Sequence, residues 1–390
     1  MKEMFNRNAI GVRGSCLSFA PTPMALGLNI SMVGFAMKRH GDLWNELTSY
    51  RNLLRSLQRA ARGKRDLPNV TRFRFHQEVE LHRLQDELRD HTYQPGAYRT
   101  FEIFEPKRRM ISAAPFRDRV VHHALCAVLE PIFEPTFIPN SYACRVGKGT
   151  HAAVDRFQQF ARTNQFVLKC DLSKFFPSID HELLKATIAR KIKDPGVLWL
   201  VAKLIDHSNP QEPILRWFPG DDLLTPSEHR RGLPIGNQTS QFFANVFLNP
   251  LDHFVTEELH AKCYVRYVDD FVILSNDRTW LAEARDRCRA FLQRLRLTLH
   301  PDKSVVSRTR DGTRYLGYRV FPGHRLLAKG NALRMRRRLR HWQRQFARGA
   351  LSLEDVRRRL VSWLGHAGQA DTHRLCEGLL GRTLFRRNIA

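Results

Sequence analysis

Two strand-forming runs flank a pair of adjacent aspartates, and this pattern constrains the fold more than any other part of the sequence. Residues 264–268 and 271–274 are rich in β-branched and aromatic side chains, and Asp269 and Asp270 stand between them. The pattern predicts a β-hairpin over residues 262–275 with an acidic tip. Two like charges beside apolar strands repel and resist burial, so a positive group must offset them, and Mg²⁺ is the natural candidate. The alternative is that the two aspartates only form the turn, where Asp is common.

A third aspartate follows another apolar run. Residues 166–170 (Phe-Val-Leu-Lys-Cys) predict a buried strand, and Asp171 stands at its end. If this strand end lies beside the acidic hairpin tip, three carboxylates converge on one point. Two-metal phosphoryl transfer requires such a cluster, since one metal activates the attacking 3′-oxygen and the other stabilises the departing pyrophosphate.

The remaining segments mix helical and strand patterns, which predicts an α+β fold. Apolar spacing predicts helices over residues 43–63, 70–90, 118–130, 178–193, 239–254 and 280–295. Pro131 is expected to end the third of these helices. Short strands are expected over residues 100–104 and 110–113 and as a pair within 313–327. The buried stripe expected for the second helix consists of Val79, Leu81, Leu84 and Leu88.

The chain is strongly basic. Its 64 Lys and Arg outnumber 38 Asp and Glu, which gives a formal net charge of +26. This excess favours a polyanionic partner, either nucleic acid or an anionic membrane surface. No run of 18 apolar residues occurs, so a membrane-spanning helix is not expected.

Part of the positive charge lies on a predicted C-terminal helix from residue 329 onward. Met335, Leu339, Trp342 and Phe346 form its apolar stripe. A face of arginines surrounds this stripe and is expected to contact a nucleic-acid duplex or template, although a solvated face is the alternative. The arginines expected to bind nucleic acid are Arg334, Arg337, Arg338, Arg340 and Arg344.

The cysteines and the N-terminal segment bear on the compartment. Seven Cys form no C-x-x-C pair, which favours a reduced, cytoplasmic protein without a disulfide framework or structural zinc. Residues 1–36 are expected to be a disordered extension, or to precede a true start at Met37. A secretory signal is the disfavoured alternative, because Pro21, Pro23 and Asn29 interrupt the apolar stretch.

The acidic patterns belong to a longer series of sequence blocks. Residues 166–176 (FVLKCDLSKFF) and 267–270 (YVDD) resemble palm motifs A and C of reverse transcriptases. Further blocks that resemble this family follow in its order at residues 106–119, 142–150, 232–237, 299–303 and 315–318. The resemblance covers residues 38–327 and implies a right-hand polymerase. Its expected parts are an extension (1–36), N-terminal helices and fingers (37–165), a palm (166–327) with an insertion near 206–231, and a basic helical thumb (328–390).

One branch of the family fits the motif B block best. Ile235 precedes Gly236, where most reverse transcriptases have Gln, and residues 237–241 (Asn-Gln-Thr-Ser-Gln) follow. This run resembles reverse transcriptases of diversity-generating retroelements, which copy a template RNA with frequent errors opposite adenine. A Gln beside the incoming nucleotide can hydrogen-bond and fix it, whereas Ile offers only shape and apolar contact. The alternative is that Ile235 only packs within the palm.

The resemblance also implies roles at the reaction centre. Asp171, Asp269 and Asp270 would be catalytic and would bind two Mg²⁺ ions, or Mn²⁺ in their place, with Leu172 as a further metal-binding residue. Lys303 matches a lysine that protonates pyrophosphate, and an ordinary surface lysine is the alternative.

Other matched positions would contact the nucleotide or the template. Phe176 matches the steric gate that excludes a ribose 2′-OH, with Phe175 as its rival. Lys107 and Arg109 match residues that hold the triphosphate and cover the base, with a solvated basic turn as the alternative. Lys148, between Gly147 and Gly149, is expected at the template strand or else in a simple turn. Ile235 and Gly236 complete the expected nucleotide site.

The expected function is error-prone RNA-directed DNA synthesis from a template-repeat RNA. The expected partners are the template RNA, an RNA–DNA hybrid, deoxynucleoside triphosphates and a small, basic, oligomeric accessory protein; no membrane partner is expected. One alternative is another bacterial reverse transcriptase, from a group II intron, a retron or a phage-defence system. A non-catalytic RNA-binding protein of the same fold is the alternative from another class.

Overall fold

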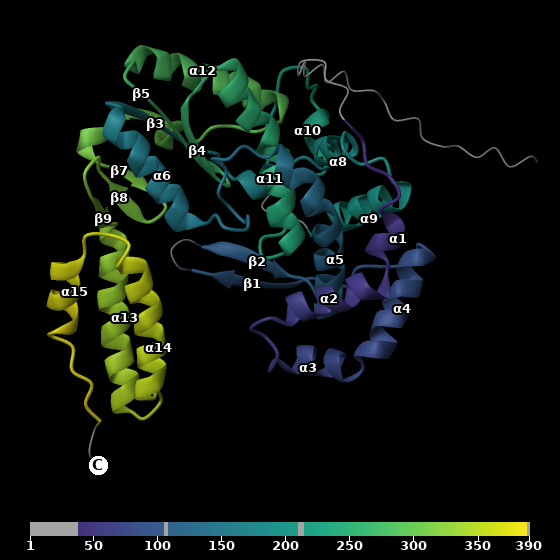
Figure 1. Ribbon diagram of the computed structural model, residues 1–390, viewed down its shortest axis with the longest axis horizontal. Coiled ribbons are helices and arrows are strands. Elements are labelled where there is room, and N and C mark those ends of the chain that lie inside the picture. The colour runs from purple at the N-terminus through teal and green to yellow at the C-terminus, as the bar shows by residue number, and fades with distance from the viewer. Residues whose placement is uncertain (1–37, 105–107, 210–213, 388–390) are drawn as a thin grey trace, which may run out of the picture. The chain divides into compact units, whose positions relative to one another are not determined.

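The computed structural model describes residues 38–104, 108–209 and 214–387 (Figure 1). The extension expected over residues 1–36 and the expected triphosphate ligand Lys107 lie outside these ranges. The first elements are short helices followed by a hairpin and one long helix. They are α1 Trp44–Leu47, α2 Tyr50–Ala61, α3 Pro68–Phe75, α4 Gln77–Arg89, β1 Arg99–Ile103, β2 Arg109–Ala113, α5 Phe116–Phe133 and the 3₁₀ turn Glu134–Thr136.

Helices of the N-terminal half pack around α5. Helices α2 and α5 contact each other along their lengths, and α11 (Gln238–His253) packs on another part of α5. Eleven side chains of α5 are buried, among them Val120 and Leu125, because the helix is apolar on most sides and is covered by its neighbours. Strands β1 and β2 form a separate antiparallel ribbon, in which Arg99 pairs with Ala113.

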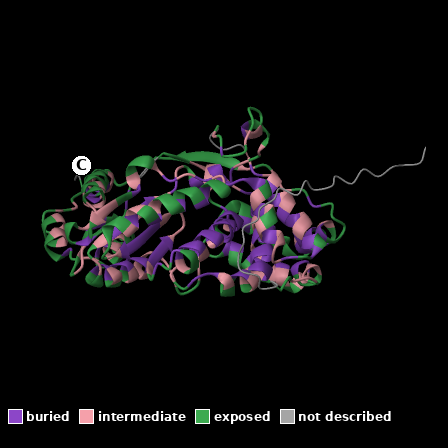
Figure 2. Cartoon of the chain, turned by 90° about the horizontal axis from the view of Figure 1, so that it is seen from above, coloured by how far each residue is buried: buried purple, intermediate pink, exposed green. Residues whose placement is uncertain are grey.

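The central sheet has four antiparallel strands in the order β4-β5-β3-β6. They are β3 Phe166–Asp171, β4 Cys263–Tyr267, β5 Asp270–Ser275 and β6 Val305–Arg308. Alternate residues of β5 enter two different cores, because side chains on a strand point to opposite faces. Phe271 and Ile273 join the core that reaches α5 and α11, whereas Val272 and Leu274 pack against α6 (Thr150–Thr163). Strands β3, β4 and β5 are mostly buried, whereas β6 is exposed or half-buried (Figure 2).

Helices cover the central sheet. Helix α12 (Arg278–Arg294) contacts β3 and β5, and α6 contacts β4 and β5. The segments that connect these elements contain the remaining short helices: α7 Phe175–Ser178, α8 His181–Ala189, α9 Pro195–Asp206, α10 Thr225–Glu228, the π-helical turn Phe254–Glu258 and the 3₁₀ turns Pro301–Lys303 and Thr309–Asp311.

A small sheet and three helices complete the described chain. The sheet has the order β7-β8-β9, with β7 Thr313–Tyr315, β8 Tyr318–Val320 and β9 Arg325–Leu327. The helices are α13 Lys329–Ala347, α14 Leu353–Ala367 and α15 His373–Leu380, and they lie side by side (Figure 1). Met335, Leu339 and Trp342 pack against Val356 of α14, which confirms the stripe expected for α13 except that Phe346 is only half-buried.

Several helix expectations were wrong in detail. The helix expected over 43–63 breaks before α2, where the Ser49 hydroxyl accepts the Asn52 backbone N–H as an N-cap. The helix expected over 70–90 breaks between α3 and α4. Val79 is 70% exposed, since it lies on the opposite side of α4 from the buried Leu81 and Leu84. Helix α5 also continues through Pro131 to Phe133, because a proline this near the end removes few hydrogen bonds.

The architecture confirms the expected α+β right-hand polymerase. An antiparallel palm sheet carries the aspartates, helices and a β-ribbon precede it, and a basic helical thumb follows it. Within the described residues, no helix is both long and apolar enough to cross a membrane.

Candidate active site

The three aspartates of the sequence patterns meet at one end of the palm sheet. Asp171 ends β3 and pairs in register with Asp270, the first residue of β5. Asp269 lies in the tight turn between β4 and β5, and its carbonyl accepts the Leu172 backbone N–H at 3.3 Å. The antiparallel pairing of β3 with β5 therefore brings residues about one hundred positions apart into one carboxylate cluster.

Burial and mutual repulsion make this cluster a poor host for three negative charges. Burial raises the pKa of Asp269 to about 6, and the charges of Asp270 and Asp171 add to the rise. Burial likewise raises the pKa of Asp270; Lys169 opposes this effect and Asp171 reinforces it. The site therefore has too little positive charge to balance three ionised carboxylates.

Two lysines supply part of the missing charge. Lys303 Nζ lies 2.6 Å from Asp171 Oδ2, and Lys169 Nζ lies 3.5 Å from Asp270 Oδ1. Lys169 and Asp270 thus form an ion pair but no hydrogen bond, and Asp270 Oδ1 is buried with no hydrogen-bond partner. A buried carboxylate oxygen without a donor is costly, so this atom is suited to a cation.

The donor atoms of the carboxylate cluster are of the kind that a hard divalent cation prefers. Mg²⁺ prefers carboxylate oxygens, and Asp270, whose Oδ1 has no hydrogen-bond partner, pairs in register with Asp171. As the side chains stand, no three His, Cys, Asp or Glu groups in the described ranges are arranged to hold a metal, and Lys303 occupies one oxygen of Asp171. The Leu172 side chain is a hydrocarbon buried in the core, so the backbone carbonyl is the only group of this residue that could bind a metal.

A cavity of about 850 Å³ opens over the aspartates. It is bordered by β1 and β2, by the chain that follows β3, and by the motif B loop. The residues that line it are Glu102, Arg108, Arg109, Met110, Asp171, Leu172, Ser173, Lys174, Phe175, Phe176, Pro177, Ile235, Asp269, Asp270, His300 and Lys303. Most of the expected catalytic and nucleotide residues thus face one space.

The two candidate steric gates differ in their surroundings. Phe175 is 2% exposed and belongs to the main core, whereas Phe176 is half-buried and packs on its outside. Their rings meet edge to face, with centroids 5.4 Å apart. Of the two rings, Phe176 therefore has more surface available to a substrate.

The motif B loop is fastened to strand β2. The Ile235 carbonyl accepts the Ser112 backbone N–H at 3.0 Å, and the Asn237 side chain bonds the backbone of both Ser112 and Ala114. Gly236 has φ +118°, and a Cβ atom there would lie 3.1 Å from Ile111, so a glycine is required. These contacts hold the half-buried Ile235 at the cavity wall.

Sequence reasoning did not identify the clamp made by Asn237 or the anchor made by Arg216. Arg216 Nη2 donates to Ser173 Oγ at 2.9 Å, two residues beyond Asp171, and Arg216 also bonds Thr298. Both contacts join segments far apart in the chain, and no local pattern signals them. Arg108 also lines the cavity, where it pairs with Glu102 at 2.8 Å. Arg109 lies close enough to Asp269 to lower the pKa of its carboxyl, although burial raises that pKa by more.

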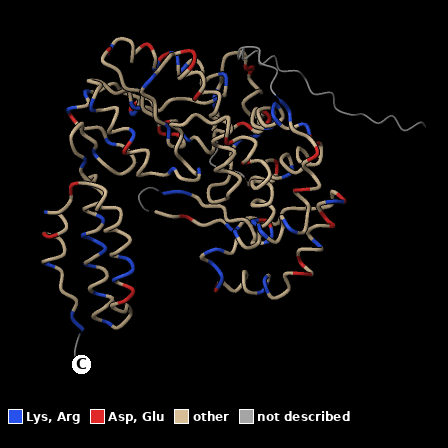
Figure 3. Tube along the Cα trace, in the orientation of Figure 1, with Lys and Arg blue, Asp and Glu red and all other residues tan. Residues whose placement is uncertain are grey.

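Some expected nucleic-acid residues lie outside the cavity. Lys148 Nζ donates to the Pro139 carbonyl at 2.8 Å and lies over the Tyr142 ring. The basic thumb helix α13 contains no Asp or Glu (Figure 3). Four of its expected arginines are exposed, whereas Arg334 is half-buried and bonds Asn331. The exposed ones are Arg337, Arg338, Arg340 and Arg344.

Comparisons with known proteins agree with this geometry. Residues 104–320 match the family model described as "Reverse transcriptase (RNA-dependent DNA polymerase)". Protein YkfC of Escherichia coli (strain K12) is 28% identical, and the match covers 67% of this chain and 74% of that protein. Group II intron-encoded protein LtrA of Lactococcus lactis subsp. cremoris is 23% identical, over 62% of this chain and 50% of its own length.

A solved structure is also similar. Apo telomerase from Candida tropicalis matches at 11% identity and a TM-score of 0.41, over 60% of this chain and 47% of the telomerase chain. The chain thus spans about half the length of LtrA and of this telomerase. Since the family model matches more than half of the residues, the chain belongs to the reverse transcriptase family of RNA-directed DNA polymerases.

Proposed function

We propose that this chain makes error-prone complementary DNA from a template-repeat RNA, as reverse transcriptases of diversity-generating retroelements do. This proposal rests on the position of Ile235, which lines the cavity over the aspartates where most of the family has Gln. An apolar side chain there offers the incoming base no hydrogen bond, so a mispair loses little. The Ser112 and Asn237 bonds that hold the loop support a direct role for Ile235 at the nucleotide.

In this proposal Asp171, Asp269 and Asp270 hold two Mg²⁺ ions, or Mn²⁺ in their place, with the Leu172 carbonyl beside them. The bound metals supply activation of the attacking 3′-oxygen and neutralisation of the leaving pyrophosphate. Lys303, released from Asp171, carries a proton toward that pyrophosphate.

Other residues orient the substrates. Arg109 holds the triphosphate, a role also expected of Lys107 from the sequence. Gly236 allows close backbone approach, and the Phe176 ring excludes a ribose 2′-OH. The exposed arginines of α13 hold the RNA–DNA hybrid by its phosphates, without reading bases. The template strand passes Lys148, and a small, basic accessory protein joins the complex.

The test is the error spectrum of complementary DNA copied from a defined RNA. We expect Ile235→Gln to lower misincorporation opposite template adenine while errors at other template bases change less, because Gln can hydrogen-bond the incoming nucleotide. Ile235→Leu is the matched control, since it keeps the apolar contact and should keep the error spectrum. An unchanged spectrum in Ile235→Gln would remove the basis of the proposal.

The similarity to LtrA favours a second candidate function, that of a reverse transcriptase encoded by a group II intron. A protein of that kind would bind its own intron RNA far more tightly than an unrelated RNA of equal length. A neighbouring pair of genomic repeats that differ mainly at adenines would instead support the diversity-generating role.

A further inference from the structure

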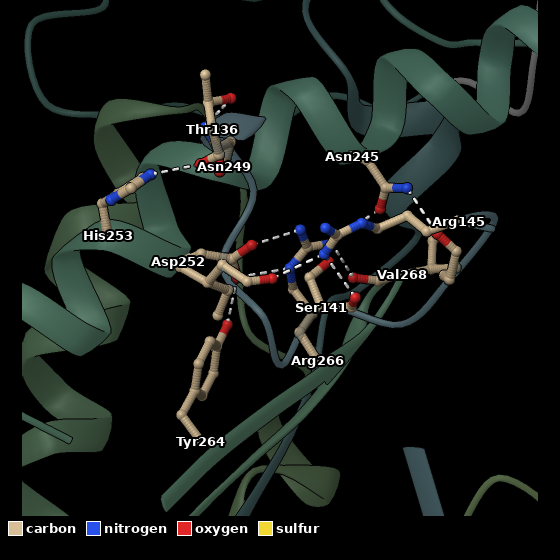
Figure 4. Close-up of polar contacts among 12 residues, drawn as sticks. Thr136, Ser141, Arg145, Asn245, Asn249, Asp252, His253, Tyr264, Arg266 and Val268 are labelled. Atoms are coloured by element: carbon tan, nitrogen blue, oxygen red, sulfur yellow. Dashed lines mark hydrogen bonds and ion pairs between the residues drawn. The ribbon is translucent and has the colours of Figure 1, made fainter. Parts of the chain in front are cut away.

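A fully buried ion pair contacts Val268, the residue before Asp269 and Asp270 (Figure 4). Arg266 on β4 donates from Nε and Nη2 to the two carboxylate oxygens of Asp252 on α11, each at 2.6 Å. Both side chains are 0% exposed. Tyr264 donates its hydroxyl to the same carboxylate at 2.8 Å.

The remaining nitrogen of Arg266 reaches the backbone of the turn. Its Nη1 donates to the Val268 carbonyl at 3.2 Å and to Asn245 Oδ1 at the same distance. Asn245 in turn donates to the Ala143 carbonyl at 2.8 Å. The guanidinium therefore ties α11 and the segment before α6 to the residue that immediately precedes Asp269.

The backbone of Val268 is strained and has to be held by its neighbours. Its φ of +54° lies in the left-handed region, which a β-branched residue adopts only when its surroundings force it. The next carbonyl, of Asp269, accepts a bond from Leu172, which follows Asp171. The position of the Val268 peptide therefore sets the positions of Asp269 and Asp270 relative to Asp171.

Stability alone does not account for this ion pair. Removing two charges from water costs about as much as their attraction returns, and apolar side chains of similar size fill such a site equally well. Apolar side chains have no donor for the Val268 carbonyl, however. The forked guanidinium can satisfy Asp252 with two nitrogens and hold the turn with the third.

We propose that Arg266 is a positioning residue, which holds the Val268 carbonyl and thereby fixes Asp269 and Asp270 at the geometry that metal binding and nucleotidyl transfer require. It touches no substrate and acts only through the turn. This inference rests on the proposed reaction at the three aspartates.

The test replaces the buried polar group while preserving its packing. In the variant Arg266→Met/Asp252→Leu/Tyr264→Phe, we expect a folded protein with at most a modest fall in the unfolding midpoint, because no buried charge is left unpaired and only the Val268 carbonyl and Asn245 Oδ1 lose a donor. Amide hydrogen exchange over residues 266–272 should accelerate, while exchange in α5 stays unchanged. The kcat for single-nucleotide extension should fall about a hundredfold, the effect of misplacing reacting groups by roughly 1 Å, with primer–template affinity unchanged.

A variant that retains the charge keeps the test decisive if the triple variant fails to fold. Arg266→Lys can pair with Asp252 but cannot also reach Val268, so it should show the same faster local exchange and lower kcat. Asp194→Asn is the matched control. Asp194 is a buried carboxylate that accepts the backbone N–H groups of Leu43, Trp44 and Val197, so its variant should lose stability without a change in kcat.

Wild-type exchange over residues 266–272 together with wild-type kcat, in the triple variant or in Arg266→Lys, would overturn the proposal. The exchange measurement requires no polymerase activity. A failure of the positioning role is therefore distinguishable from a failure of the proposed reaction, which would show as absent extension by the wild-type protein.

Discussion

The raised pKa of Asp269 predicts that the carboxylate at this position lowers the free energy of unfolding of the metal-free protein. The perturbation is Asp269→Asn, an exchange of similar shape that removes the titrating group. In metal-free buffer at pH 7, the variant should be more stable than the wild-type protein. A buried carboxylate that repels Asp270 and Asp171 opposes folding, whereas an amide does not.

The magnitude follows from the shift. The carboxyl titrates near 3.8 when unfolded and near 6 when folded. At about 1.4 kcal/mol per pKa unit, this difference corresponds to a penalty of about 3 kcal/mol at neutral pH. Because the folded pKa is the higher one, the folded state binds more protons between pH 4 and 6. The penalty therefore grows as the pH rises through that window and is constant above it.

The assay is urea denaturation of both proteins at a series of pH values with a chelator present. The gain for Asp269→Asn should vanish near pH 4 and reach its full value above pH 6. Added Mg²⁺ should stabilise the wild-type protein more than the variant. Asp286→Asn is the matched control, since Asp286 is an exposed carboxylate with a lowered pKa and should give no gain. Equal or lower stability of Asp269→Asn at every pH would refute the reasoning.

Two further predictions concern the substrates. Phe176→Ala should raise incorporation of ribonucleotides with little loss of stability, whereas Phe175→Ala should cost about 3–5 kcal/mol of unfolding free energy because Phe175 is a core residue. Competition between ribo- and deoxynucleotides measures the selectivity, and equal selectivity in the wild-type protein and Phe176→Ala would contradict the role of Phe176 as the steric gate. Arg337→Glu and Arg340→Glu should each weaken hybrid binding and reduce the slope of log affinity against log salt by about 1 if that arginine contacts a phosphate. Fluorescence anisotropy at several salt concentrations measures this slope, and an unchanged slope would exclude the contact.

Patterns with a short period predicted the strands that carry the site. The run before Asp171 coincides with β3, and the acidic hairpin corresponds to β4 and β5. Both succeed because alternate residues of these strands are buried on two faces, which demands apolar and β-branched side chains at nearly every position. Helix ends were less predictable, since the break at Ser49 depends on a local cap and the break at His76 has no side-chain cap that would signal it.

The supports of the site could not be predicted because they depend on topology. Asn237 and Ser112 lie 125 residues apart, and only the docking of β2 on the motif B loop brings them together. Arg266 offers a partial signal, because the alternation of β4 places it on the same buried face as Tyr264. Nothing in the sequence identifies Asp252 as its partner. A charged residue at a buried strand position therefore indicates a role beyond packing.

The most direct test of the central claim is extension of a DNA primer annealed to an RNA template, with deoxynucleoside triphosphates and Mg²⁺. The wild-type protein is predicted to extend the primer. Asp171→Asn is predicted to give no product while retaining its fold and its affinity for the primer–template. Equal extension by both proteins, or no extension by the wild-type protein, would contradict the assignment of the aspartates as the centre of an RNA-directed DNA polymerase.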